Sequence, residues 1–227
     1  MFLFGGFLLG PTRNNRRIPR WSRLASSLML VIAAWSWRAF ASDAFHQTYT
    51  TLIALGMSAG FLGDLFLANI FTHSRSKSMM GGIGSFAVGH LFYIAGILLA
   101  ARTLHLTNAL IIGGSLLLFW LCAFVGWRMV VMRNVNRGKE KPTPLHWAAL
   151  PYALLLASTA GLALALTLQS PAFWLLALGA TLFLLSDLLL AEALFSYSSI
   201  PLHHDFVWLL YGPGQMFIVY NAMLLLR

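Results

Sequence analysis

Two aspartates lie inside stretches of the sequence that are otherwise apolar. Asp64 is in AGFLGDLFLANI, residues 59–70, and Asp187 is in FLLSDLLLAE, residues 183–192. An unpaired carboxylate in membrane hydrocarbon costs at least ~2.5 kcal/mol, so intramembrane acids indicate a function by default. Two carboxyl groups in unlike environments can divide proton donation from charge stabilisation or water activation, as they do in glycoside hydrolysis.

Further polar residues recur at helical spacing in other apolar stretches. In GSFAVGHLFYIAG, Phe86, His90 and Tyr93 follow the i, i+4, i+7 pattern of one helix face. In WLLYGPGQMF, Tyr211 and Gln215 share a face, with the helix-breaking Pro213 between them. At a rise of ~1.5 Å per residue, Asp64, His90, Asp187 and Gln215 all lie roughly 10–16 Å from the same membrane side. The sequence therefore predicts that polar groups from four helices meet at one level.

The composition is that of a multi-pass membrane protein. Of 227 residues, 59% are hydrophobic and 9% are charged, and the mean hydropathy is +0.77; soluble domains carry about 25% charged residues. We expect an all-α bundle forming one transmembrane domain over residues 1–227. A helical span needs about 20 apolar residues, and seven segments qualify: 21–41, 47–71, 80–101, 107–131, 145–168, 172–196 and 206–226.

The N-terminal stretch MFLFGGFLLG, residues 1–10, is apolar but too short to span. We expect an interfacial or half-inserted segment, or the remnant of a first span.

The net charge is +9. The positions of the basic residues indicate a membrane-topology signal rather than a nucleic-acid-binding site. The basic residues gather in three short segments on one side of the predicted helices, and the positive-inside rule places that side in the cytoplasm. The loop 197–205 then also faces the cytoplasm. The short loops favour a bacterial inner membrane. The basic residues are Arg13, Arg16, Arg17, Arg20 and Arg23, then Arg75 and Lys77, then Arg128, Arg133, Arg137, Lys139 and Lys141.

Four motifs together resemble those of the lysoplasmalogenase family of multi-pass membrane proteins, also called YhhN-like. They are GFLGDLFL, GSFAVGHLFY, FLLSDLLLA and YGPGQMFIVY, in the family's order and spacing. The resemblance covers about residues 15–227. Two features depart from the family pattern: the first of eight spans is shortened, and Gly-Pro-Gly interrupts the last helix.

The resemblance implies hydrolysis of the vinyl ether bond of lysoplasmalogens to a fatty aldehyde and a glycerophospho-headgroup. That reaction begins with protonation of an alkene carbon and passes through an oxocarbenium ion. Asp64 and Asp187 are the expected catalytic pair, with no cofactor and no metal. The expected partners are a lysophospholipid and the lipid bilayer. The residues expected to orient the acids or hold the substrate are His90, Tyr93, Ser186, Tyr211 and Gln215.

Two other functions fit parts of the pattern. A metal-dependent, ceramidase-like lipid hydrolase would use Asp64, Asp187 and His90, with His203 or His204 from a loop that we expect to be solvated. A proton-coupled transporter would use the acids as a relay, although the sequence has no inverted repeat. Basic residues such as Arg75, Lys77 or Arg133 are candidates for attracting a phosphate group.

Overall fold

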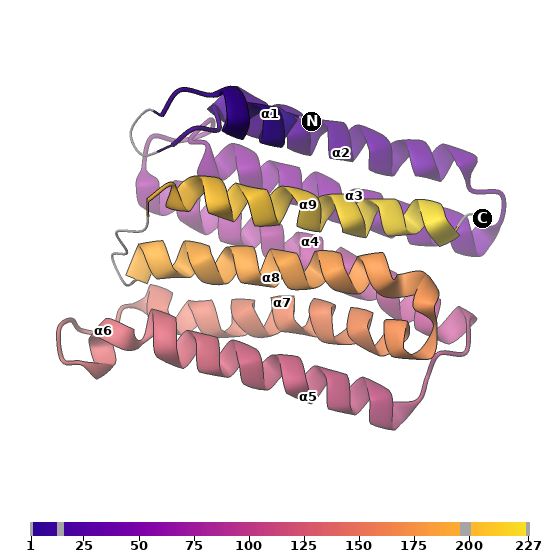
Figure 1. The fold of residues 1–227 in the computed structure, drawn as a ribbon. Helices are drawn as coiled ribbons and strands as arrows, with labels where there is room; N and C mark the ends of the chain where they lie inside the picture. Colours follow the sequence, from indigo (N-terminus) through magenta and orange to yellow (C-terminus); the bar gives the residue numbers. More distant parts are fainter. Residues whose placement is uncertain (1, 13–15, 196–200, 226–227) are drawn as a thin grey trace.

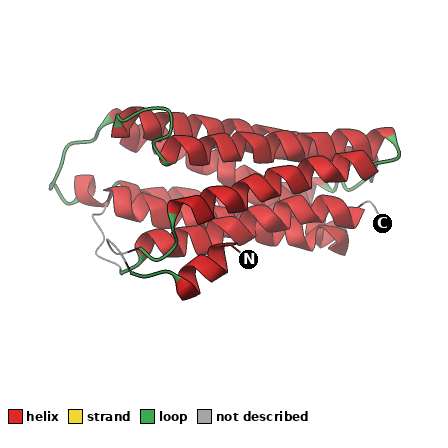
Figure 2. Ribbon diagram, turned by 90° about the horizontal axis from the view of Figure 1, so that it is seen from above, coloured by secondary structure: helices red, strands yellow, loops and turns green. Residues whose placement is uncertain are grey.

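The computed structural model describes residues 2–12, 16–195 and 201–225, and over these residues the regular structure is helical (Figures 1 and 2). The long helices run roughly parallel or antiparallel in one elongated bundle. The elements are α1 (Phe2–Leu9), α2 (Arg20–Phe40), α3 (Ala44–Leu67), α4 (Arg75–Thr103), α5 (Ala109–Gly126), a π-helical turn (Trp127–Val131), α6 (Arg133–Asn136), α7 (Pro144–Gln169), a 3-10 turn (Pro171–Phe173), α8 (Trp174–Phe195) and α9 (His203–Leu225).

Short connections make sequence neighbours pack as antiparallel pairs. α3 packs against α2 and α4, α8 packs against α7 and α9, and α4 meets α7 while α2 meets α9. These six helices enclose a core that includes the fully buried Tyr49, Ile97 and Phe173. α5 packs mainly against α7, on the outer side of the bundle.

All seven apolar segments predicted from the sequence form helices. Five of them, 44–67, 76–103, 109–131, 144–169 and 171–195, are long and apolar enough to cross a membrane. α2 and α9 have 21 and 23 residues but are more polar. Three arginines reduce the hydropathy of α2, and His203, Asp205 and Asn221 contribute to the polarity of α9.

The short N-terminal stretch forms α1, a helix of eight residues that packs against α2 and α9. Leu3 is buried there beside Gly212. A Cβ atom at Gly212 would lie 2.0 Å from Leu3 Cδ1, so the glycine leaves the space that Leu3 fills. Gly212, the first glycine of the Gly-Pro-Gly sequence, thus makes room for the shortened N-terminal helix.

The expectation that residues 203–205 lie in a solvated loop is wrong. They form the first turn of α9, and His203 and Asp205 are buried. Asp205 Oδ2 accepts a hydrogen bond from the Arg17 backbone N–H at 2.6 Å, and Oδ1 accepts one from the Ile18 N–H at 3.1 Å. A carboxylate is favourable at a helix N-terminus, and here it also holds the segment that leads into α2. Residues 197–200 of the predicted cytoplasmic loop, and Arg13, lie outside the described residues.

We expect Asp205→Ala to lower the free energy of unfolding by about 2–4 kcal/mol, because two backbone donors would lose a charged acceptor. Asp205→Asn keeps one acceptor oxygen and should cost less. Thermal unfolding of the purified protein in detergent measures both. Identical unfolding of Asp205→Ala and wild type would contradict this role.

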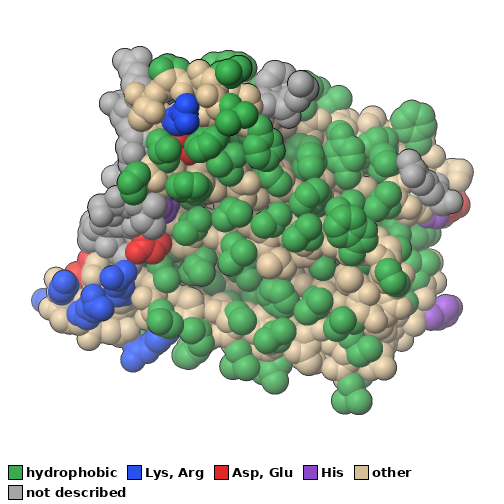
Figure 3. All heavy atoms as spheres, in the orientation of Figure 1, with side chains coloured by type: hydrophobic (Ala, Val, Ile, Leu, Met, Phe, Trp, Pro, Cys, Tyr) green, Lys and Arg blue, Asp and Glu red, His purple; other side chains and the backbone are tan. Residues whose placement is uncertain are grey.

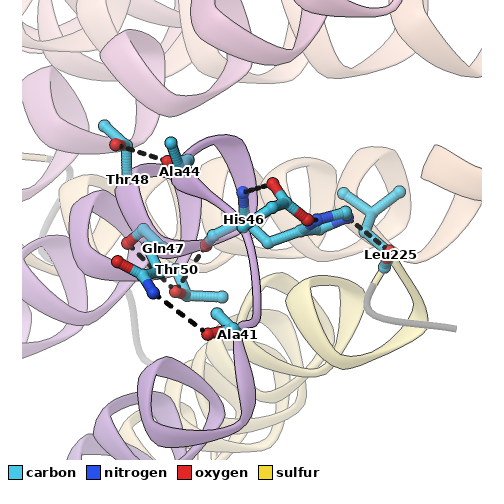
Figure 4. Close-up of polar contacts among 8 residues, drawn as sticks. Ala41, Ala44, His46, Gln47, Thr48, Thr50 and Leu225 are labelled. Carbon is cyan, nitrogen blue, oxygen red and sulfur yellow. Dashed lines mark hydrogen bonds and ion pairs between the residues drawn. The ribbon is translucent and has the colours of Figure 1, made fainter.

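The opposite end of the bundle is held by a second set of polar contacts (Figure 4). Asp43 caps α3 by accepting from the His46 N–H at 3.0 Å. The His46 ring contacts the Asp43 carboxylate through Nδ1 and reaches the Leu225 carbonyl oxygen through Nε2 at 2.8 Å. This contact ties the end of α9 to the start of α3.

Candidate functional site

A cavity of about 690 Å³ opens near one end of the bundle and is lined by both aspartates. We call this the basic end, because Arg16, Arg20, Lys77, Arg133 and Arg137 lie at or near it. Figure 3 shows Lys and Arg side chains gathered where α6 lies, while hydrophobic side chains cover the flank of the bundle. Asp64 reaches the cavity from α3 and Asp187 from α8. Two of the four predicted polar groups, from α3 and α8, therefore meet at one cavity.

A directed chain of hydrogen bonds leads to Asp64. The Tyr93 hydroxyl donates to Gln215 Oε1 at 2.7 Å, Gln215 Nε2 donates to the Tyr211 hydroxyl at 3.4 Å, and that hydroxyl donates to Asp64 Oδ2 at 2.9 Å. Ser27 of α2 also interacts with this carboxyl group. Asp64 is only 2% exposed and Gln215 is fully buried. Residues of α2, α4 and α9 thus fix the orientation of one carboxyl group on α3.

Asp187 has a different and simpler environment. Its Oδ2 accepts a hydrogen bond from the Tyr152 hydroxyl of α7 at 2.6 Å. Tyr152 lines the cavity, and the sequence interpretation missed it. The available signal was depth: Tyr152 lies eight residues after Pro144, about 12 Å along the helix at the usual rise. That is the level assigned to the other polar groups.

The remaining predicted residues take three different positions. Ser186 lines the cavity, but its hydroxyl donates to the Val207 carbonyl oxygen at 3.1 Å and joins α8 to α9. Tyr93 and Gln215 lie behind Tyr211, where they contact Asp64 only through the chain. His90 is buried away from both acids. Its Nδ1 lies 2.9 Å from Thr159 Oγ1, and its ring packs edge-on against Phe183 with centroids 4.6 Å apart.

Three glycines of α3 leave space for residues of this site. A Cβ atom at Gly56 would lie 2.3 Å from the Tyr93 ring. One at Gly60 would lie 2.9 Å from Gln215 Nε2, and one at Gly63 would lie 2.9 Å from the Phe86 ring. Small residues spaced four apart along a membrane helix allow close contacts between helices. Here the spacing makes room for the aromatic and amide groups beneath Asp64.

Arginines from the start of α2 and the segment before it form the polar wall of the cavity. Arg16, Arg20 and Arg23 line it, together with His73 and His204. Two of the residues suggested from the sequence for phosphate do not: Lys77 is exposed elsewhere, and Arg133 Nη1 pairs with Glu192 Oε1 at 3.3 Å. The third, Arg75, has a side chain that lies outside the described part of the structure. Arginines that line the cavity cannot be told from those that face outward by local sequence.

The residues expected of a metal-dependent hydrolase do not assemble in the described part of the chain. No three His, Cys, Asp or Glu side chains come together there in a metal-binding group. His90 does not reach the cavity, and His203 Nε2 bonds to the Leu189 carbonyl oxygen at 2.7 Å.

A family model for YhhN proteins matches residues 21–222, which include all four motifs. The chain belongs to the YhhN family. This family is associated with lysoplasmalogenase activity. No curated protein and no solved structure is significantly similar to the chain. For this YhhN protein, membership supports a membrane-embedded hydrolase, and the reaction must be argued from the site.

Proposed function

We propose that this YhhN protein hydrolyses the vinyl ether bond of lysoplasmalogen-type lysophospholipids, with Asp64 and Asp187 as the catalytic pair. One observation carries the proposal: two aspartates from different helices line a single cavity, and each is held by a tyrosine hydroxyl. Their charges are close enough to interact. A pair of positioned carboxyl groups suits a reaction that needs a proton donor and an anion beside an oxocarbenium ion.

Asp187 is the proposed proton donor. Among the described residues its only hydrogen bond comes from Tyr152 to Oδ2, so Oδ1 can carry a proton. Asp64 interacts with two hydroxyl groups and with the charge of Arg23, which stabilise a carboxylate. Unlike surroundings of this kind separate an acid from a base in other carboxylate pairs.

The reaction then proceeds in three balanced steps. Asp187 transfers its proton to the alkene carbon remote from the ether oxygen, which leaves positive charge shared by the other alkene carbon and that oxygen. The carboxylate of Asp64 stabilises this oxocarbenium ion and takes a proton from the water that adds to it. The resulting hemiacetal collapses to a fatty aldehyde and the free hydroxyl of the glycerophospho-headgroup. Asp64 then gives up the proton that it took from water, and the gain of one proton by Asp187 restores both groups to their starting state.

The supporting residues position these groups. Tyr211 and Tyr152 fix the carboxyl groups, while Gln215 and Tyr93 hold Tyr211. Ser186 fixes α8 against α9 beside Asp187. His90 packs against Phe183, whose ring contacts Tyr211. Apolar residues of α4, α5 and α8 complete the cavity and offer space for a single fatty chain.

We place the protein in a bacterial inner membrane, with the basic end of the bundle in the cytoplasm. The positive-inside rule supports this orientation. We also propose that α2 and α9 span with the five more apolar helices, giving seven full spans. Both have spanning length and pack against the others along the bundle.

Tyr152→Phe should lower kcat by about 10–100-fold, because Asp187 becomes a carboxylate as it gives up its proton, and a hydrogen bond to a charged group contributes about 1.5–3 kcal/mol. Tyr220→Phe is the matched control: this tyrosine is 38% exposed on α9 and lies outside the cavity. Equal kcat values for Tyr152→Phe and wild type would remove Tyr152 from the mechanism. Aldehyde release under saturating substrate measures both variants.

The proposed reaction is tested with three lysophospholipids that share a headgroup and differ in the bond at the first glycerol carbon. Purified protein should release aldehyde from the vinyl ether lipid. It should leave the saturated alkyl ether lipid intact, because that lipid has no alkene carbon to protonate. Release of fatty acid from the acyl lipid alone would instead indicate an esterase. Dependence on a metal, judged by chelation and metal analysis, would favour the metal-dependent hydrolase.

A further inference from the structure

The arginines on the cavity wall are unlike the other basic residues of this end. A cation that serves only as a topology signal is expected to face water or lipid headgroups. Lys77 is exposed, and Arg133 pairs with Glu192 outside the cavity. Arg23 is partly buried, and its guanidinium lies over the Trp208 ring, 5.4 Å from the centroid. Its Nε is buried and has no hydrogen-bond partner in the described part of the chain.

The positive charge of this wall is not balanced by the neighbouring acids. Arg16 and Arg20 are close enough to Arg23 for their charges to interact. Asp205 and Asp64 also interact with Arg23, so two carboxyl groups face three guanidinium groups. The Asp205 oxygens accept backbone hydrogen bonds from Arg17 and Ile18 rather than from Arg23. The cavity therefore has an anion-attracting wall with an unused donor.

His204 adds a further polar group to the same wall. Its imidazole ring can form a hydrogen bond with a ligand in the cavity. Arg16, Arg20 and Arg23 supply the charged donors of the wall.

We propose that Arg16, Arg20, Arg23 and His204 form the subsite for the phosphodiester of the lysophospholipid headgroup. The planar guanidinium of arginine matches phosphate oxygens in a two-pronged contact, which makes arginine well suited to phosphate recognition. Trp208 holds the Arg23 guanidinium in place through a cation–π contact. The subsite rests on the proposed function, because it explains how a lysophospholipid is oriented on the aspartate pair.

The position of the subsite fits the length of the substrate. Arg23 and Asp64 line the same cavity, and their charges interact. In a lysoplasmalogen only five bonds separate the vinyl ether oxygen from phosphorus. A phosphate held by Arg23 therefore keeps the reacting bond near the aspartates, while the apolar side of the cavity receives the chain. The subsite makes the phosphate, rather than the nitrogen-containing end of the headgroup, the main determinant of recognition.

The test measures binding without turnover. The ligands are an acyl lysophosphatidylethanolamine, the monoacylglycerol with the same chain, and glycerophosphoethanolamine, with inorganic phosphate as the tail-free and glycerol-free comparison. Wild type should bind the lysophospholipid at least ten-fold more tightly than the monoacylglycerol. Arg23→Gln should remove most of that difference, and Arg23→Lys should restore only part of it, since charge returns without the two-pronged contact. Arg20→Gln, at an exposed position, gives a second variant if Arg23→Gln does not fold.

Lys77→Gln is the matched control, because it removes one positive charge from the same end outside the cavity. Equal wild-type affinity for lysophospholipid and monoacylglycerol would overturn the subsite, as would an equal loss of affinity in Lys77→Gln and Arg23→Gln. Inorganic phosphate that binds as tightly as glycerophosphoethanolamine would show a site for free phosphate rather than for the headgroup. The acyl lipid is not a vinyl ether, so its binding does not depend on the proposed reaction. Tighter binding of the lysophospholipid than of the monoacylglycerol, without aldehyde release from the vinyl ether lipid, would support the subsite and exclude the proposed reaction.

Discussion

Asp64→Asn and Asp187→Asn are each expected to lower kcat for aldehyde release by ~10²–10⁴-fold, the usual contribution of a positioned acid or base. Asparagine keeps the size of the side chain and an oxygen that can accept from the neighbouring tyrosine. It can neither donate the carboxyl proton nor supply a negative charge. The two losses should not multiply in the double variant, because both groups act in one reaction sequence.

The matched control is Asp43→Asn, which changes an aspartate at the opposite end of the bundle. It should leave kcat unchanged. Each variant is first compared with wild type by size-exclusion profile and thermal unfolding, so that a loss of activity is separated from a loss of fold. Full activity in both Asp64→Asn and Asp187→Asn would exclude the pair as the catalytic groups.

Gly56→Ala should lower the free energy of unfolding by about 1–3 kcal/mol through overpacking. The added Cβ would lie 2.3 Å from the Tyr93 ring and 3.0 Å from the Gly89 carbonyl oxygen, so α3 and α4 must separate. Because Tyr93 begins the hydrogen-bond chain to Asp64, kcat should fall together with stability.

Gly84→Ala, in the next helix, is the matched control for Gly56→Ala. A Cβ atom there meets nothing within 4 Å, and alanine favours a helix over glycine by up to ~1 kcal/mol. This variant should therefore be as stable as wild type or more stable. Thermal unfolding in detergent measures both substitutions. Equal stability of Gly56→Ala and Gly84→Ala would mean that the contact with Tyr93 does not restrict α3.

The positions of the helices could be predicted from hydropathy because each helix is an apolar run of spanning length between short polar segments. The ends of those helices were harder to predict. His203, His204 and Asp205 are polar enough to suggest a loop, yet Asp205 is buried because backbone donors from Arg17 and Ile18 reach it. Such a contact joins residues about 190 positions apart, and local composition carries no trace of it.

The candidate site was partly predictable for the same reason. Asp64, Asp187, Tyr211 and Gln215 are conspicuous because polar groups are costly in an apolar segment. Tyr152 is less conspicuous, since tyrosine is common in membrane proteins near the interface. Which arginines line the cavity depends on how α2 packs against α3 and α9, and this packing is a tertiary property. The grouping of His90 with the acids rested on depth, on helical spacing and on the family motif, and the structure turns its ring toward Thr159 instead.

Proton transfer to the alkene by the aspartate pair is tested most directly by a reaction in D₂O, with a vinyl ether lysophospholipid as substrate and the mass of the released aldehyde as the measurement. The aldehyde is trapped before the hydrogens next to its carbonyl group can exchange with solvent. Wild type should release aldehyde carrying one deuterium at the carbon next to the carbonyl, because the acid delivers a solvent-derived proton to that alkene carbon. Asp64→Asn and Asp187→Asn should release little of it. Aldehyde without that deuterium, or no aldehyde from folded wild type, would contradict proton transfer to the alkene by an aspartate pair.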